Sequence, residues 1–491
     1  MSKNGSGQSN LPKNGFSRRD FLKTGALSGL FLGSAGLMGC TAPGTSRDYA
    51  GRAKNVIFLV SDGMSIGALT MADSMLRRRD GRPSNWIRLY EEGKVSRGLM
   101  DMASANSLVT GSAAASSSWG CGVRINNGAV NMSPDGEEFT PVLPIFRDAG
   151  KATGLVTTAR ITHATPAGFS VNSPERGLED EIAVKQLTGN FDVLMGGGNS
   201  HFDPALRSDG LDLYARARDA GYSIFRTKGE MAAYDGSGKV LGIFSDSHVP
   251  YTLDHINTPE YVENVPALAE MTRAAINRLS RNPNGFILQI EGGRVDHAAH
   301  SNDIGGLIYD QIAFDDAIGA VLEFTANRDD TLVFITTDHG NASPSLNAAG
   351  SFYNDSNPNF DKIVNFKYTN NWILSGLNRD SSVSQIQERI EEATMLQVST
   401  RHAGILRQAY REEYEPVYSM MSTPSAALGQ ILAEHTSVNW VGTGHTSDYV
   451  ELAAYGPGSE AIGYFTRNTD LFGLMTRAAG VQVPESSAYP A

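Results

Sequence analysis

Two short apolar runs of this chain are closely followed by an acidic residue, and this pattern constrains the fold most strongly. One residue separates the run at 56–60 (Val-Ile-Phe-Leu-Val) from Asp62, and one residue separates the run at 332–336 (Leu-Val-Phe-Ile-Thr) from Asp338. Such uninterrupted apolar runs are typical of strands buried on both faces of a parallel sheet. Functional side chains gather at the carboxyl ends of such strands. The sequence therefore predicts a parallel sheet with carboxylates along one edge.

The rest of the chain alternates between strand-like and helix-like segments. Further strand-like runs lie at 154–158, 191–195, 286–290 and 451–455, and helical patterns lie at 267–280 and 301–324. This alternation predicts an α/β fold, a three-layer sandwich in which a largely parallel central sheet is flanked by helices.

One long stretch breaks this alternation. We expect residues 347–439 to form an insertion, a cap or crown near the site, with a loop at 354–359 and a charged helix at 382–411. The remaining 55–491 region is long for one domain, but α/β folds often run to this length as a single unit.

The N-terminus is typical of an exported protein. Residues 17–23 (Ser-Arg-Arg-Asp-Phe-Leu-Lys) resemble a twin-arginine export signal, and the apolar stretch at 24–38 is too short to span a membrane. Leu-Met-Gly-Cys40 follows the pattern of a bacterial lipobox, in which the cysteine is acylated and becomes the first residue after cleavage. The alternative is a signal peptide with a chance cysteine.

These signals predict how the first part of the chain is organised and where the protein goes. We expect a twin-arginine lipoprotein signal at 1–39 and a linker at 40–54 that begins with the lipidated cysteine. The protein would then be periplasmic or at the cell surface, anchored to a membrane through the lipid on Cys40.

Charge and cysteine content exclude some partners and crosslinks. The first 39 residues carry five Lys or Arg and one Asp, so their removal lowers the formal net charge from −12 to −16. Such a chain should repel nucleic acid and anionic membrane, so we expect membrane contact only through the lipid. The chain has two cysteines. With Cys40 lipidated, Cys121 would have no partner and no intramolecular disulfide could form.

Metal-ligating residue types gather in a few short segments. Asp296 and His300 are four residues apart, a spacing that places both on one face of a helix. Asp338 is followed directly by His339, and a lone His445 lies near the C-terminus. Carboxylate and imidazole together are typical ligands of zinc. The sequence therefore suggests a hydrolase that uses several metal ions.

A candidate nucleophile precedes a small-residue run. Ser112 is followed by three alanines that read as the start of a helix, whose N-terminal amides would favour an anionic phosphate. Taken alone, such a serine would more often cap or pack a helix.

The order of these residues along the chain resembles that of the alkaline phosphatase family. It reads Asp62, Ser112, His163-Ala-Thr165, Arg176, Glu291, Asp296, His300, Asp338-His339 and His445. The thirteen-residue interval from His163 to Arg176 also matches the family. On these motifs, from about residue 55 to 479, the chain is identified as a member.

The resemblance implies an activity and a set of cofactors. The chain would hydrolyse small phosphate monoesters to an alcohol and inorganic phosphate through a phosphoserine on Ser112, with Arg176 binding two phosphoryl oxygens. Water activated at zinc would then release the phosphate. Two zinc ions and one magnesium ion are implied, and a homodimer is left open. The implied ligands are Asp296, His300 and His445 for one zinc, Asp62, Asp338, His339 and Ser112 for the other, and Asp62, Thr165 and Glu291 for magnesium.

One residue departs from the common family pattern, and two others vary within the family. Gly111 stands where the family commonly has an aspartate that holds the arginine, so we expect Arg176 to be held more loosely and phosphate to be retained more weakly. His163 and His297 sit around the third site, where some members carry Asp and Lys, and this His pair resembles the animal enzymes and many bacterial ones. They could recruit zinc there, or hold waters around magnesium, which is the expected ion. The other histidines are expected to be structural or exposed, namely His201, His248, His255, His402 and His435.

Two alternative functions remain open at this stage. One is a phosphodiesterase or sulfatase built on the same scaffold, although the Ser112 segment lacks the Cys/Ser-x-Pro/Ala-x-Arg motif of sulfatases. The other is a non-catalytic lipoprotein that binds metal or phosphate, which would have no use for an activated serine.

Overall fold

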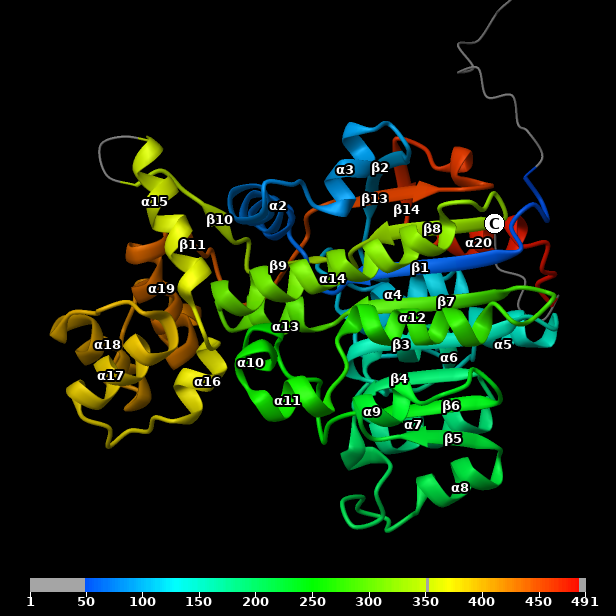
Figure 1. Ribbon diagram of the computed structural model, residues 1–491, viewed down its shortest axis with the longest axis horizontal. Helices are drawn as coiled ribbons and strands as arrows, with labels where there is room; N and C mark the ends of the chain where they lie inside the picture. The colour runs from blue at the N-terminus through cyan, green and yellow to red at the C-terminus, as the bar shows by residue number, and fades with distance from the viewer. Residues whose placement is uncertain (1–48, 350–352, 485–491) are drawn as a thin grey trace, which may run out of the picture. The chain divides into compact units, whose positions relative to one another are not determined.

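The computed structural model describes residues 49–349 and 353–484 of the chain. Cys40 and the expected signal and lipobox lie outside these residues, as does the expected linker up to residue 48. The described chain contains a central sheet of ten strands in the order β14-β2-β13-β8-β1-β7-β3-β4-β6-β5 (Figure 1). The strands are β1 (Asn55–Ser61), β2 (Ser96–Asp101), β3 (Ala152–Arg160), β4 (Val193–Gly197), β5 (Tyr222–Phe225), β6 (Lys239–Ile243), β7 (Phe286–Gly292), β8 (Thr331–Thr336), β13 (Val450–Tyr455) and β14 (Phe465–Arg467).

The sheet is largely parallel, as predicted. β13 is the exception, because it pairs antiparallel with both β8 and β2. All six predicted strands are present, although β4 begins two residues later than expected. The strands β2, β5, β6 and β14 were not predicted.

Helices cover both faces of the sheet and explain why the central strands are apolar throughout. In β1, Ile57 and Leu59 face one hydrophobic core, whereas Val56, Phe58 and Val60 face the other. The first core is closed by α2 (Ile66–Asp80), α3 (Asn85–Glu91), α9 (Lys228–Ala232), α10 (Thr252–Asn257), α12 (Leu268–Leu279), α13 (Arg294–His300) and α14 (Ile304–Thr325). α11 (Pro259–Asn264) contacts α9 and α10.

The second helical layer carries the serine segment. It consists of α4 (Ser112–Cys121), α5 (Val142–Asp148), α6 (Ala164–Ser170), α7 (Glu179–Thr188), α8 (Leu213–Asp219) and α20 (Asp470–Ala478). The two layers and the sheet between them confirm the predicted three-layer α/β fold (Figure 1).

A group of helices lies between the two strands of a short antiparallel ladder, β10 (Ser345–Leu346) and β11 (Val438–Asn439). The helices are α15 (Ser356–Asp361), α16 (Asn370–Ser375), α17 (Val383–Thr394), α18 (Thr400–Tyr410) and α19 (Pro424–Thr436). They project to one side of the sheet in Figure 1. Thr369, just before α16, donates from its backbone N and its hydroxyl to the two carboxylate oxygens of Asp254 in α10, at 2.8 and 2.7 Å.

Two expectations for this segment are wrong. The predicted loop at 354–359 is instead a 3-10 turn (Tyr353–Asp355) followed by α15, because Phe360 is buried and Ser356 donates to the carbonyl of Asn347. The predicted helix at 382–411 is two helices, because Met395 adopts a left-handed conformation (φ 60°) that ends α17. Ser399 then caps the start of α18 by accepting from the backbone N of His402.

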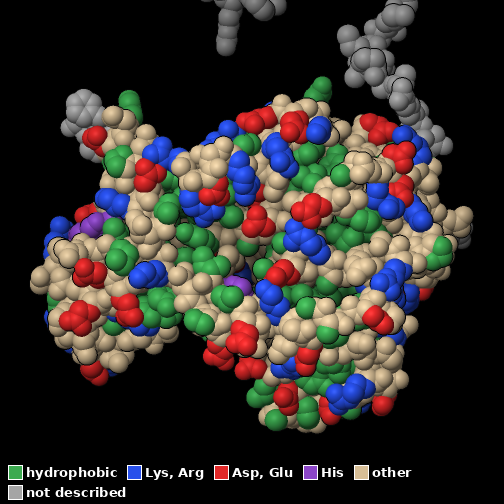
Figure 2. All heavy atoms as spheres, in the orientation of Figure 1, with side chains coloured by type: hydrophobic (Ala, Val, Ile, Leu, Met, Phe, Trp, Pro, Cys, Tyr) green, Lys and Arg blue, Asp and Glu red, His purple; other side chains and the backbone are tan. Residues whose placement is uncertain are grey.

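Three further features of the described chain concern its surface charge, its helices and its cysteine. On the face shown in Figure 2, acidic and basic side chains are intermingled. In the described part of the chain, no helix is both long enough and apolar enough to cross a bilayer. Cys121 is buried and carries a free thiol.

Candidate active site

The carboxyl ends of β1 and β8 bring the first acidic residues together. Asp338 Oδ1 accepts a hydrogen bond from the backbone N of Gly63 (2.9 Å), the residue after Asp62. Gly63 has φ 67°, and a Cβ there would lie 2.4 Å from Asp296 Oδ1. Only glycine therefore allows the Asp62 loop and Asp296 to approach so closely.

The first predicted ligand group, Asp296, His300 and His445, is brought together in the structure. One ligand atom of each lies within 4.8 Å of the others. His300 Nε2 lies 3.4 Å from Asp296 Oδ2 and 3.0 Å from His445 Nε2. Nδ1 of His300 donates to the carbonyl of Thr443 (2.6 Å), and Nδ1 of His445 donates to the carbonyl of Thr110 (2.8 Å). The lone pair of each Nε2 atom is therefore available to coordinate a cation.

The second predicted group also gathers around one imidazole. His339 Nε2 lies 3.1 Å from Asp338 Oδ2, 3.7 Å from Asp62 Oδ1 and 3.4 Å from Ser112 Oγ. Asp296 belongs here as well, because one ligand atom each of Asp296, Asp62 and His339 lie within 4.8 Å of one another. The first and second groups therefore share a carboxylate, which the sequence did not indicate.

The third predicted group shares Asp62 with the second group. Glu291, at the end of β7, accepts from Thr157 Oγ1 of β3 at 2.5 Å. Thr165 Oγ1 is buried and has no hydrogen-bond partner in the described chain. His163 lies within ligand distance of Asp62 and Glu291, so it is nearer to this group than the outer position expected for it.

Three imidazoles pack beside the third group. The ring of His297 lies 5.5 Å from that of His163 and 4.2 Å from that of His248, measured between centroids. His248 was expected to be merely structural or exposed. It is partly buried beside this group, and its Nε2 lies 2.6 Å from Arg160 Nη1.

Ser112 is the first residue of α4, as the sequence predicted, and only 1% of it is exposed. α4 packs closely on α6, since a Cβ on Gly168 would lie 2.2 Å from Ser116 Oγ. This close packing fixes the serine relative to His163 and Thr165 at the start of α6.

Arg176 reaches the same region from a loop. Its Nη2 lies 2.8 Å from His163 Nε2, and its backbone N donates to the carbonyl of Gly128 (2.8 Å). Its positive charge lowers the pKa of Asp62, although burial and neighbouring carboxylates outweigh it. Among the described residues, no ion pair joins Arg176 to a carboxylate, and its guanidinium contacts His163 instead.

The electrostatics of the site favour bound cations. Burial, Asp338 and Asp296 raise the pKa of Asp62 well above its usual range, and burial raises the pKa of Glu291 to about 7. Burial also opposes the charge on Asp296, but His300 holds the pKa of that carboxyl well below its usual value. Burying several carboxylates together is costly unless cations or donors compensate them.

Unpaired buried atoms show where those cations would bind. Within the described residues, the buried atoms without a hydrogen-bond partner include both carboxylate oxygens of Asp62, Glu291 Oε1, Asp338 Oδ2, Thr165 Oγ1 and His163 Nδ1. Natural proteins rarely leave such atoms unsatisfied. The residues present therefore fit a cluster of divalent metal ions.

Sequence reasoning missed several residues that contact the ligands. Thr157 faces Glu291 across the β3–β7 ladder. Asn341 donates from Nδ2 to Asp296 Oδ1 at 2.7 Å. The only sequence signal for Asn341 was its position two residues after His339.

An α/β sheet whose strand ends present buried carboxylates, imidazoles and a serine defines a metal-dependent hydrolase. The family model for alkaline phosphatase matches residues 53–481. The chain therefore belongs to the alkaline phosphatase family, which hydrolyses phosphate monoesters, and the predicted resemblance is confirmed.

Individual relatives cover nearly the whole chain. Alkaline phosphatase 4 of Bacillus subtilis is 30% identical, over 90% of this chain and 92% of its own length. Streptomycin-6-phosphate phosphatase of Streptomyces griseus is 29% identical, over 92% of this chain and 97% of its own. The crystal structure of Thermus thermophilus alkaline phosphatase is 32% identical with a TM-score of 0.83, and covers 91% of this chain and 96% of its own.

Proposed function

We propose that this alkaline phosphatase acts through a covalent phosphoserine on Ser112, with two zinc ions and one magnesium ion as cofactors. The observation that carries the proposal is the position of the serine. Its Oγ is buried at the start of α4, 3.4 Å from His339 Nε2 and beside carboxylates that lack partners. A serine that only packed a helix would have no use for these neighbours.

The three ligand groups differ in chemistry, and this difference supports the choice of ions. Asp296, His300 and His445 would hold one zinc ion, and Asp62, Asp338 and His339 the other, because carboxylate and imidazole suit zinc. Asp62, Thr165 and Glu291 offer only oxygen, which suits magnesium. Because His163 adds a nitrogen nearby, zinc is the alternative occupant of the third position. Bound together, the ions would stabilise charge on the phosphoryl and leaving oxygens and lower the pKa of the serine hydroxyl and of water.

The protein's own residues would position the phosphoryl group. The first amides of α4 would face its oxygens. Arg176 would bind two of them through the guanidinium N–H groups that His163 leaves free. Ser112 Oγ would attack phosphorus as the P–O bond to the alcohol breaks. Water would then attack the phosphoserine, releasing inorganic phosphate with overall retention of configuration.

Hydrolysis of p-nitrophenyl phosphate from pH 7 to 11 tests this proposal, using chelator-treated protein restored with zinc and magnesium. Ser112→Ala should lose nearly all turnover. Ser118→Ala is the matched control, because Ser118 is buried in the same helix and donates only to the carbonyl of Ala114. Acid-quenched wild-type enzyme should show a phosphate adduct on the peptide that contains Ser112. Metal-dependent turnover that survives in Ser112→Ala would refute the phosphoserine.

The same assay separates the alternatives. A phosphodiesterase would prefer bis(p-nitrophenyl) phosphate. A binding lipoprotein would take up zinc and phosphate in both wild type and Ser112→Ala without turnover in either.

We also propose that the protein is exported in its folded state and anchored through a lipid on Cys40, on the strength of the sequence signals before residue 41. Cys40→Ser should release the protein from membranes, and Lys in place of Arg18 and Arg19 should block export. Cys121→Ser is the matched control for Cys40, because it removes the other cysteine of the chain. Membrane attachment that persists in Cys40→Ser would exclude this anchor.

A further inference from the structure

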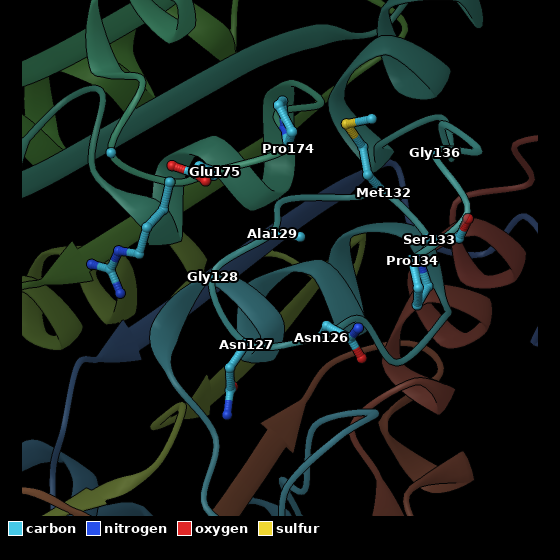
Figure 3. A pocket seen from close by; sticks show the side chains of 12 residues that line it. Asn126, Asn127, Gly128, Ala129, Met132, Ser133, Pro134, Gly136, Pro174 and Glu175 are labelled. Atoms are coloured by element: carbon cyan, nitrogen blue, oxygen red, sulfur yellow. The ribbon is translucent and has the colours of Figure 1, made fainter.

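The segment 126–130 joins the two residues that would contact the phosphoryl group. It follows α4 and lies between the loop before Ser112 and the loop that carries Arg176. Residues 126–129 of this segment also line a pocket of about 540 Å³ (Figure 3).

The side chain of Asn127 holds the serine loop with both of its polar atoms. Oδ1 accepts a hydrogen bond from the backbone N of Gly111 (2.9 Å), and Nδ2 donates to the carbonyl of Val109 (2.9 Å). Thr110, between these two residues, accepts from His445 Nδ1 through its carbonyl (2.8 Å). The side-chain amide of Asn127 therefore holds the residues on both sides of Thr110, whose carbonyl supports the proposed zinc ligand His445. One of these residues, Gly111, directly precedes Ser112.

The other end of the segment holds the arginine loop. The carbonyl of Gly128, next to Asn127, accepts from the backbone N of Arg176 (2.8 Å). Two residues further on, Val130 and Ser173 exchange a pair of backbone hydrogen bonds of 2.9 Å each. The backbone at Arg176 is thus tied to the residue that follows Asn127.

These contacts show how the chain can set the spacing of its phosphate-binding residues without a carboxylate at position 111. Gly111 is extended (φ −105°, ψ 162°) and directs its N–H to Asn127. Asparagine suits this position because its amide both accepts and donates, whereas a carboxylate only accepts. We propose that Asn127 is a positioning residue that fixes the distance between Ser112 and Arg176. This inference rests on the proposed function.

Asn126 provides a matched control in the same loop. Its side chain makes no hydrogen bond within the described residues, and Figure 3 shows the two asparagine side chains leaving the loop in different directions. Asn127→Ala should raise KM and the inhibition constant of inorganic phosphate by about tenfold each, the worth of two net hydrogen bonds. kcat should change much less. Asn126→Ala should stay within about twofold of wild type on both constants.

A double-mutant cycle separates positioning from a general structural role. Asn127 is inferred to act by positioning the serine loop relative to Arg176. In a protein that already carries Arg176→Ala, adding Asn127→Ala should therefore reduce the affinity for phosphate little further. Additive losses would mean that Asn127 only stabilises its loop, and would overturn the inference. A thermal unfolding scan of each variant checks the fold, and Asn127→Ser replaces Asn127→Ala if the latter unfolds.

Calorimetric binding of inorganic phosphate to the metal-restored protein keeps this test independent of turnover. Ser112-dependent hydrolysis with Asn127→Ala indistinguishable from Asn126→Ala would overturn only this inference. Absence of hydrolysis would sink the proposed function, while a tenfold loss of phosphate affinity confined to Asn127→Ala would still support the positioning role.

Discussion

At the scale of single residues, Asn341 contacts several parts of the site although sequence reasoning did not predict it. Its side chain donates to Asp296 Oδ1 at 2.7 Å, and it pairs with His445 in the ladder of β9 (Gly340–Asn341) and β12 (His445–Thr446). Its backbone N donates to Ser65 Oγ (2.9 Å), and that hydroxyl in turn donates to its carbonyl (3.0 Å). Asn341 is buried and therefore connects the chain segments that carry four proposed ligands, namely Asp62, Asp296, His339 and His445.

Asn341→Ala should weaken zinc binding by about 10- to 100-fold, the usual cost of losing a residue that orients a metal ligand. Competition with a chromophoric chelator measures this affinity without relying on turnover. Asn131→Ala is the control, because its buried amide donates only to the carbonyls of Gly168 and Val171. That variant should lose stability but keep its zinc affinity. Equal zinc losses in the two variants would refute a specific role.

Gly111→Asp tests the departure from the family pattern. The position accepts a side chain, because a Cβ there would meet only Asn127 Oδ1, at an ordinary 3.8 Å. A carboxylate before Ser112 should hold Arg176 more firmly, tighten inhibition by inorganic phosphate severalfold and slow product release. Steady-state kinetics with added phosphate measure both effects. The idea fails if inhibition and turnover stay as in wild type.

The residues at the ends of predicted strands could be named from sequence because each lies within two positions of the end of a predicted strand run. Asp62, Glu291 and Asp338 all have this signal. Thr157 and Asn341 lack it, since their contacts depend on which residue each faces across a ladder. Sequence patterns predict a strand far better than its register.

At the scale of elements, Met395 is a strained helix end. It adopts φ 60° at the C-terminus of α17 and is 56% exposed, so its side chain contributes little packing. Met395→Gly should raise the free energy of unfolding by about 1 kcal/mol, because glycine adopts this conformation without a Cβ penalty. Chemical denaturation measures the change. Met420→Gly, also exposed but without a positive φ, should destabilise instead, and equal effects would argue against strain at Met395.

The central strands were predictable and the edge strands were not. Strands such as β1 and β8 are buried on both faces, which leaves a continuous apolar run. β5 lies at the sheet edge with a half-exposed pattern, so it resembles a loop in sequence. The direction of β13 had no signal either, because an apolar run reads the same in a parallel or an antiparallel pair.

At the scale of the whole molecule, the metal cluster should control stability. Removing the ions leaves buried carboxylates uncompensated, so chelation should lower the melting temperature at neutral pH. Burial raises the pKa of Glu291 to about 7 from 4.5, so the metal-free folded state holds a proton that the unfolded chain releases. Burial opposes charge on His300, yet its bond to Asp296 raises its pKa to about 9.

Both shifts have the same sign. Below about pH 6.5 they are opposed by His163, His297 and His445, because burial lowers the pKa of each of these imidazoles. The metal-free protein should therefore lose stability as the pH rises from about 7 to about 9, whereas the metal-restored protein should change less. Differential scanning calorimetry with and without chelator measures this. A metal-free melting temperature that rises over this range would contradict the role given to Glu291 and His300.

The position of β13 has a consequence for synthesis of the chain. β2, which leads into the loop before Ser112, is bound to the sheet only through β13 and β14, and both strands lie beyond residue 449. His445 also comes from this last tenth of the chain. Ser112, the proposed nucleophile, is therefore synthesised long before the strands and the histidine that complete its surroundings. A truncated chain that lacks them should be inactive rather than partly active.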